Sequence, residues 1–176
     1  PAGCGPQITA LAWQTLRSDP SLAFYVIAPP AVFGGLCPVA PITAPAEAAA
    51  AFTDALPVLA LETDVPMPTA GKPDPSTAPA ILSSIDQAVS DTQAGNAAAI
   101  VTNPINKALL YSAGFTHPGH TEYIAALCTP DGASPLRPVM MLTGGGLRVA
   151  LATIHMPLME TAAAITRESL TEIAQI

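Results

Sequence analysis

Charged residues are scarce in this chain of 176 amino acids, and basic residues are the scarcest of them. Asp, Glu, Lys and Arg make up 11% of the sequence, whereas roughly a quarter is usual in soluble domains. Six Lys and Arg against thirteen Asp and Glu give a formal net charge of −7. This balance argues against nucleic acid as a partner, because such binding needs a basic face that displaces counterions. It does not exclude a small anionic substrate, since a few cations or a helix N-terminus can hold one.

Long apolar runs and cysteines are also few. No run approaches the roughly 18 apolar residues of a membrane span, so we expect a soluble, cytoplasmic protein with no membrane partner. The three cysteines, Cys4, Cys37 and Cys128, match neither a zinc spacing nor a disulfide framework. Each is most simply a small buried apolar residue in a reducing compartment.

Both ends lead us to expect a piece of a longer protein. The chain opens at Pro1, without a methionine or a charged-then-apolar leader. Near the other end, the apolar residues Leu170, Ile173 and Ala174 fit one helical face, and no glycine or proline follows to stop the helix.

What the chain does have is a large apolar content cut into short elements. Half of its residues are hydrophobic and twenty are prolines. Helices are expected over residues 7–17, 80–95, 105–112, 121–128 and 167–176. Strands are expected over residues 22–28, 57–61, 97–101, 138–142 and 147–153. A proline-rich connection is expected over 63–79 and a glycine-turn hairpin around 143–146. This alternation predicts a layered α/β/α fold, in which the hairpin makes the sheet mixed.

Polar groups concentrate in Gly-Phe-Thr-His-Pro-Gly-His-Thr-Glu-Tyr, residues 114–123. The Pro118-Gly119 pair ends any preceding helix, so His120 and Thr121 begin the next one. Free backbone N–H groups and the helix dipole favour an anion at such a position. An imidazole and a hydroxyl there could form a phosphate or carboxylate subsite. Alternatively, Thr121 is only a helix cap and His120 a surface residue.

Two further residues are candidates for chemistry. Lys107 begins a helix that follows an expected strand, and α/β proteins place ligands at this edge of a sheet. It could equally be an ordinary exposed lysine. His155 emerges at the end of the apolar run 149–154. A single histidine is more often a satisfied polar residue than a metal ligand.

Four segments together resemble the 4-hydroxythreonine-4-phosphate dehydrogenase family. In order they are the Pro-Ala-Gly-Cys-Gly-Pro loop at residues 1–6, the Asn-Lys segment at 106–107, Gly-His-Thr-Glu at 119–122, and the Ala-Leu-Ala-Thr-x-His-x-Pro-Leu pattern at 150–158. Cys4 and Gln7 depart from the commoner Ile and Glu of the family's first loop, and the aspartate that precedes that loop is not present.

The resemblance implies a two-domain architecture similar to the isocitrate and isopropylmalate dehydrogenases. Residues 1–110 would form the first α/β domain, and residues 111–176 would begin a second domain that this sequence does not finish. It implies oxidation and decarboxylation of 4-phosphohydroxy-L-threonine, dependent on NAD or NADP and on a divalent metal, in pyridoxal 5'-phosphate biosynthesis.

Particular residues inherit roles from this resemblance. Lys107 would be catalytic and face substrate or cofactor, and His120 and Thr121 would bind the phosphorylated substrate. His155 would be one of three histidine ligands of zinc, magnesium or cobalt, in a site shared between the subunits of a homodimer. The residues that bind NAD are unknown, because the sequence contains no strand-GxGxxG-helix unit.

Two alternatives remain open. One is a paralogous dehydrogenase that acts on a phosphorylated sugar acid, such as erythronate or threonate phosphate, or on an aromatic dihydrodiol. The other is an inactive fragment that only binds anions.

Overall fold

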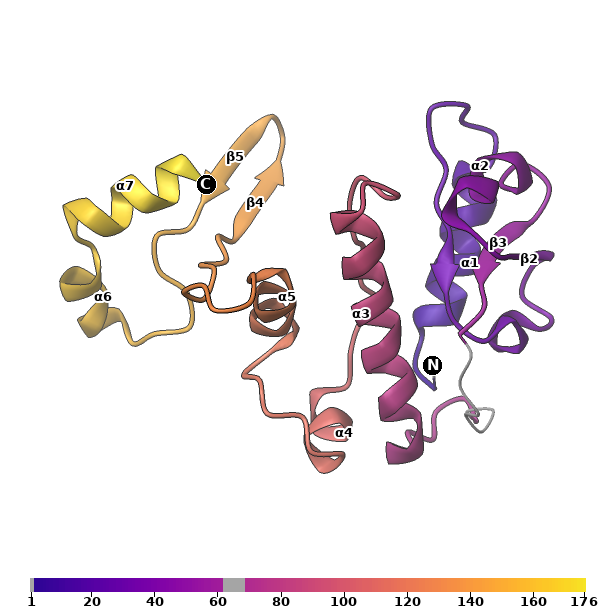
Figure 1. The fold of residues 1–176 in the computed structure, drawn as a ribbon, viewed down its shortest axis with the longest axis horizontal. Coiled ribbons are helices and arrows are strands. Elements are labelled where there is room, and N and C mark those ends of the chain that lie inside the picture. The colour runs from indigo at the N-terminus through magenta and orange to yellow at the C-terminus, as the bar shows by residue number, and fades with distance from the viewer. Residues whose placement is uncertain (1, 62–68) are drawn as a thin grey trace. The chain divides into compact units, whose positions relative to one another are not determined.

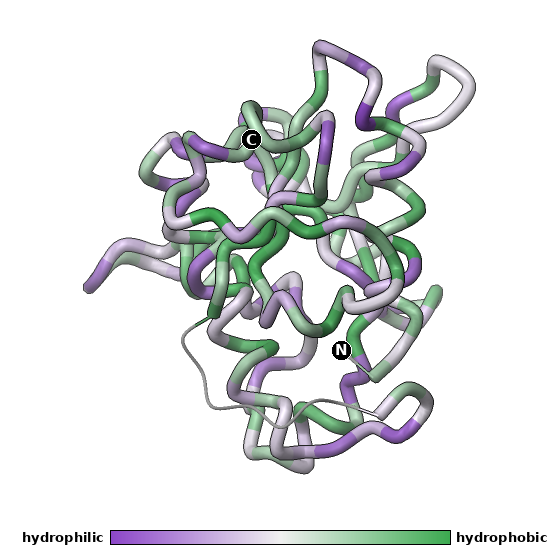
Figure 2. Tube along the Cα trace, turned by 90° about the vertical axis from the view of Figure 1, so that its right-hand side faces the viewer, coloured by the Kyte–Doolittle hydropathy of each residue, from purple (hydrophilic) through white to green (hydrophobic). Residues whose placement is uncertain are grey.

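The computed structural model describes residues 2–61 and 69–176, which form two compact units, Pro1–Pro130 and Asp131–Ile176 (Figure 1). Apolar and polar stretches follow one another along the described residues (Figure 2). No helix in the described ranges has the length and apolar character that crossing a bilayer requires.

The first unit contains a small parallel sheet. Its strands are β1 (Val26–Ile27), β2 (Val39–Ile42) and β3 (Leu56–Leu59), in the spatial order β1-β3-β2. In the register, Val26 of β1 and Pro41 of β2 both pair with Val58 of β3. The central strand is the most deeply buried one, as parallel pairing on both of its edges requires.

Helix α1 (Gly5–Leu16) and the short helix α2 (Ala48–Ala51) frame the principal core. Leu56 and Val58 of β3 are fully buried in this core, where they pack with Trp13, Phe33 and Phe52. The Trp13 indole Nε1 donates a hydrogen bond of 2.7 Å to the Phe52 carbonyl oxygen. The bond satisfies a polar group that would otherwise be costly to bury.

Three more helices complete this unit: α3 (Ala78–Gln93), α4 (Lys107–Ser112) and α5 (His120–Cys128). Three 3-10 turns, η1 (Pro30–Phe33), η2 (Pro45–Glu47) and η3 (Pro75–Thr77), lie between the elements. Helix α3 contacts β1 and also α5, so it joins the sheet region to the region of the polar motif (Figure 1). A second apolar cluster, formed by Ala78, Leu109 and Leu110, seats α4 against the start of α3.

The second unit contains a β-hairpin and two helices. Strands β4 (Met141–Gly144) and β5 (Leu147–Ala150) pair antiparallel through a turn at Gly145-Gly146, whose φ angles are 56° and 83°. Both angles lie in the left-handed region that glycine adopts without strain. Helix α6 (Leu158–Ala164) precedes α7 (Arg167–Gln175), whose start is fixed by a reciprocal capping box between Thr166 and Ser169.

The α/β class, the long helices and the hairpin are confirmed, but four details of the expected fold differ. The hairpin forms a sheet of its own within the described residues, so the prediction of one mixed sheet is wrong. Residues 97–101 form no strand; three of them are alanines, which offer little side-chain surface for pairing, and Val101 is 94% exposed. Strand β2 was not expected, because it contains Pro41, which only an edge strand tolerates. Helix α6 was not expected either.

Two other expectations have no outcome in this structure. Residues 62–68 of the expected proline-rich connection lie outside the described residues. The domain boundary after residue 110 stays a prediction, since it concerns the longer family architecture and not the compact units of this chain.

Candidate functional site

Helix α4 places Lys107 at its first position. The Asn106 side chain caps the helix, because its Oδ1 accepts a hydrogen bond of 3.2 Å from the Leu109 backbone N–H. Leu109 and Leu110 are buried and hold the helix in place, whereas Lys107 is exposed. Asn106 therefore has a structural role as the cap of α4.

The start of helix α5 lies beside Lys107. A Cβ atom built on Gly119, the residue that precedes α5, would lie 3.7 Å from Lys107 Nζ and 2.7 Å from Glu122 Oε2. Because Gly119 has no side chain, the Lys107 ammonium and the Glu122 carboxylate can approach this residue. His120 and Thr121 follow it directly in the sequence. Segments that are apart in the sequence thus bring Lys107 next to the His120-Thr121 pair.

The polar groups of this cluster are free to meet a ligand. The side chains of Lys107, His120 and Thr121 make no hydrogen bond or ion pair with other residues in the described ranges. His120 and Thr121 are half-buried at the first turn of α5, where backbone N–H groups lack intrahelical acceptors. Glu122 places a negative charge in the same turn. An anion bound here would meet one cation, a helix N-terminus and one carboxylate.

Aromatic rings cluster near this turn. The His117 ring contacts Phe115 and Tyr123, with ring centroids 5.4 Å and 5.0 Å away, and Phe115 also contacts Tyr111. The Tyr111 hydroxyl donates a hydrogen bond of 2.7 Å to the Pro118 carbonyl oxygen. His117 is half-buried in this ring cluster.

The same cluster is tied to helix α3. The Tyr123 hydroxyl donates a hydrogen bond to Oδ1 of Asp86. Burial, together with this hydrogen bond and the negative charge of Asp86, raises the pKa of Tyr123 from 10.0 to about 12. The phenol is therefore a neutral donor at any ordinary pH.

Sequence reasoning missed Tyr111 and Tyr123, although a signal was present. The chain has four Phe, one Trp and three Tyr. Three of these eight rings, Tyr111, Phe115 and Tyr123, fall within residues 111–123 around the polar motif. Such a concentration in an aromatic-poor chain indicates a packed support for the motif.

The N-terminal loop and the segment before Lys107 also meet. Asn103 Nδ2 donates a hydrogen bond of 2.9 Å to Thr9 Oγ1 in α1. A Cβ on Gly5 would lie 3.2 Å from both Cβ and Cγ of Asn103. Gly5 is therefore needed for close packing, and Asn103 has a structural contact that its sequence position did not reveal.

His155 belongs to the second unit and stands apart from other potential ligands. It is exposed, and its φ of 52° is the sole positive value among the non-glycine residues described. Single residues in this strained region often occur at functional sites. The described residues contain no group of three or more His, Cys, Asp or Glu that could hold a metal ion. His155 can supply one ligand, but these residues do not complete a metal site.

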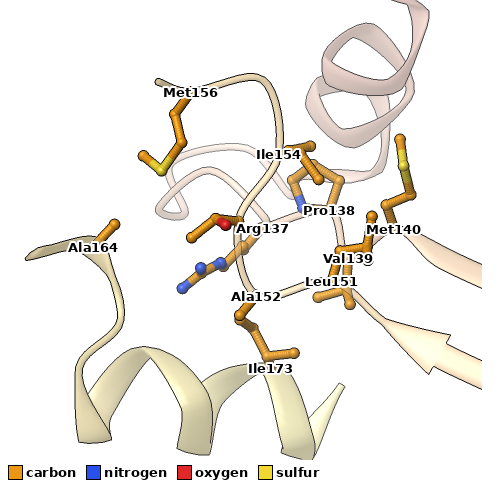
Figure 3. A pocket seen from close by; sticks show the side chains of 11 residues that line it. Arg137, Pro138, Val139, Met140, Leu151, Ala152, Ile154, Met156, Ala164 and Ile173 are labelled. Atoms are coloured by element: carbon orange, nitrogen blue, oxygen red, sulfur yellow. The ribbon is translucent and has the colours of Figure 1, made fainter. Parts of the chain in front are cut away.

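A pocket of about 210 Å³ lies within the second unit, close to His155 in the sequence (Figure 3). Apolar side chains, including Ile154, Met156 and Ile173, line most of it. Its charged residue, Arg137, forms an ion pair of 2.8 Å with Glu172. None of Lys107, His120, Thr121 and His155 lines this pocket.

Comparison with known proteins agrees with the resemblance seen in the motifs. The chain is 44% identical over 192 aligned residues to the 4-hydroxythreonine-4-phosphate dehydrogenase of Bradyrhizobium diazoefficiens, covering 100% of this chain and 54% of the relative. It is 43% identical over 174 residues to the enzyme of that name from Caulobacter vibrioides, covering 97% of this chain and 52% of the relative. The chain thus spans about half the length of these relatives.

Solved structures show the same fold. A 4-hydroxythreonine-4-phosphate dehydrogenase from Burkholderia phymatum matches with a TM-score of 0.75 and 22% identity, over 98% of this chain and 55% of that one. The corresponding protein from Klebsiella pneumoniae matches with a TM-score of 0.75 and 21% identity, over 98% and 56%. At this identity the likeness concerns the fold alone. The model of the family described as pyridoxal phosphate biosynthetic protein PdxA matches residues 26–176, and the chain therefore belongs to the PdxA family.

Proposed function

We propose that the complete protein carrying this sequence oxidises 4-phosphohydroxy-L-threonine with NAD or NADP and that the product then loses CO2. The alcohol carbon gives a hydride to the nicotinamide and the hydroxyl gives up a proton, which leaves a β-keto acid that decarboxylates. The observation that carries the proposal is the convergence of Lys107 with the Gly119-His120-Thr121 turn in a member of the PdxA family. The names of the relatives support the choice of substrate.

This chain's residues would contribute binding and orientation. His120 and Thr121 would bind the anionic end of the substrate with the N–H groups of the first turn of α5. Lys107 would add a positive charge near Gly119. A substrate held at several points keeps its reacting carbon in place, and small displacements of a reacting group cost much rate.

The proposal includes a divalent metal and a homodimer. His155 would supply one metal ligand, and the remaining ligands would come from outside the described residues, including the partner subunit. A metal ion would stabilise negative charge that develops on the substrate oxygen. The proposal also includes a two-domain architecture similar to that of isocitrate dehydrogenase.

The test is NAD(P)H formation by the complete protein with 4-phosphohydroxy-L-threonine, compared with erythronate 4-phosphate and threonate 4-phosphate. We expect a higher kcat/KM for the amino-acid phosphate and loss of turnover with a chelator. His120→Ala and Thr121→Ala should each raise KM for this substrate while the circular dichroism spectrum is unchanged. Preference for a sugar-acid phosphate would point to the paralogous dehydrogenase. Absence of NAD(P)H with every substrate would contradict a dehydrogenase.

A further inference from the structure

Helix α3 carries two tyrosine–aspartate hydrogen bonds that face different parts of the first unit. Tyr25, next to β1, donates to Oδ2 of Asp91 at 2.8 Å, and Tyr123 of α5 donates to Oδ1 of Asp86. At 3.6 residues per turn, Asp86 and Asp91 lie roughly 140° apart around the helix axis. One bond therefore ties α3 to the sheet region, and the other ties it to the polar motif.

Tyr123 lies in the first turn of α5. Its backbone N–H donates to the Gly119 carbonyl oxygen at 3.1 Å, which closes that turn. Residues three apart on a helix are neighbours on its surface, so Tyr123 and His120 share one face. The hydrogen bond of the Tyr123 side chain to Asp86 consequently restrains the orientation of the turn that contains His120 and Thr121.

The cluster of rings formed by Tyr111, Phe115, His117 and Tyr123 connects helix α5 to helix α4. Tyr111 lies one helical turn after Lys107, and its hydroxyl holds the Pro118 carbonyl oxygen. Phe115 contacts Tyr111, His117 and Tyr123. Helices α4 and α5 are thereby packed against the same rings. One of these rings, that of Tyr123, donates a hydrogen bond to Asp86.

We propose that Tyr123 and Asp86 are a positioning pair, which holds the first turn of α5 so that His120 and Thr121 can bind the phosphate group of the substrate. The inference rests on the proposed function. Neither residue touches the substrate in this proposal; both act through the turn that they hold. Because the raised pKa of Tyr123 keeps its phenol neutral at ordinary pH, its hydroxyl stays a hydrogen-bond donor to Asp86 there.

The first experiment compares Tyr123→Phe and Asp86→Asn with Tyr25→Phe in the complete protein. The control removes a tyrosine–aspartate bond of the same kind, on the same helix, away from the motif. We expect KM for the phosphorylated substrate to rise about tenfold in Tyr123→Phe and Asp86→Asn, with KM for NAD(P) within about twofold of wild type. Tyr25→Phe should lower the Tm but leave both KM values unchanged. The double variant Asp86→Asn/Tyr123→Phe should be no worse than the more impaired single variant.

A second readout does not depend on turnover. The His120 imidazole, whose signals are assigned by their loss in His120→Ala, can be followed by NMR during titration of the complete protein with inorganic phosphate. We expect a phosphate-dependent shift of the His120 signals in wild type and in Tyr25→Phe, and a weaker response in Tyr123→Phe. Should one of these variants fail to fold, Asp86→Asn tests the same bond from its other side.

The outcomes separate this inference from the proposed function. Equal KM values and equal phosphate responses in Tyr123→Phe and Tyr25→Phe would overturn the positioning pair and leave the dehydrogenase standing. A wild-type protein without turnover, but with a His120 response that Tyr123→Phe weakens, would overturn the dehydrogenase and support the pair. A wild type with neither turnover nor a phosphate response would overturn both.

Discussion

Lys107 differs from the other lysine of the chain in its structural setting. The chain has two lysines, Lys72 and Lys107, and both are exposed. Only Lys107 approaches the turn before α5, where its Nζ lies 3.7 Å from the position of a Cβ on Gly119. An exposed charge contributes little to stability, so the role we propose for Lys107 is in binding.

The matched lysine provides a direct test. Lys107→Ala should raise KM for the phosphorylated substrate about tenfold, because a charge-assisted contact to phosphate is lost. Lys72→Ala should leave KM within about twofold of wild type. Steady-state kinetics of the complete protein measure both effects, and equal KM values in the two variants would remove Lys107 from the site.

His155 combines an exposed imidazole with a left-handed backbone, and the two properties can be separated. Asparagine tolerates a positive φ better than alanine does. His155→Asn should therefore keep the Tm near that of wild type while it removes an imidazole ligand and lowers the bound metal, as measured by elemental analysis of the complete protein. Unchanged metal content and near-normal turnover would show that His155 is not a ligand.

Tyr123 predicts a dependence of stability on alkaline pH. Its pKa is raised from 10.0 to about 12 in the folded protein, so its contribution is fully present below pH 10 and is lost as pH rises toward about 12. Tyr123→Phe should therefore lower the free energy of unfolding at neutral pH, and its deficit relative to wild type should shrink across this range. Denaturant unfolding at several pH values measures the difference. A deficit that is constant from neutral to strongly alkaline pH would contradict the bond to Asp86.

At the scale of elements, the contact between the N-terminal loop and the segment before α4 depends on a missing side chain. Gly5 is the first residue of α1, so Gly5→Ala would gain at most part of the roughly 0.5–1 kcal/mol of mid-helix propensity, whereas crowding of a packed site costs about 1–3 kcal/mol. The new Cβ would lie 3.2 Å from Asn103, so crowding should dominate and reduce the free energy of unfolding by about 1 kcal/mol.

The control for this change lies in the same loop. A Cβ on Gly3 would have no atom within 4 Å, so Gly3→Ala should be close to neutral. Adding Asn103→Ala to Gly5→Ala should recover part of the loss, because the crowded atoms beyond Cβ are removed. Denaturant unfolding followed by Trp13 fluorescence measures all three, and equal stabilities of the two glycine variants would contradict the close contact.

At the scale of the whole molecule, burial is distributed unequally between the two units. Leu56 and Val58 of β3 are 0% exposed, whereas Met141 of β4 and Leu147 of β5 are 54% and 66% exposed. Local opening is easiest where few apolar contacts cover the backbone. In a protein consisting of residues 1–176, the amides of β3 should exchange with solvent much more slowly than those of β4 and β5. Equal protection, measured by hydrogen exchange, would mean that the hairpin is covered.

The parts of the fold that were correctly predicted from sequence depend on short-range signals. Apolar residues at helical spacing indicated α3, and the Pro118-Gly119 break indicated where α5 begins. The run of three glycines at 144–146 indicated the hairpin turn. Each signal arises within a few residues, where backbone hydrogen bonds and φ preferences operate.

What the sequence determined by itself is therefore the α/β class, most helices, the hairpin and the family motifs with their candidate residues. Only the tertiary structure decided that β1, β3 and β2 pair in parallel, that the hairpin forms a separate sheet, and that Lys107 lies beside Gly119. The bond between Tyr123 and Asp86 also belongs to this second group. These features join segments far apart in the chain, and their contacts depend on how whole elements pack, which no local preference encodes.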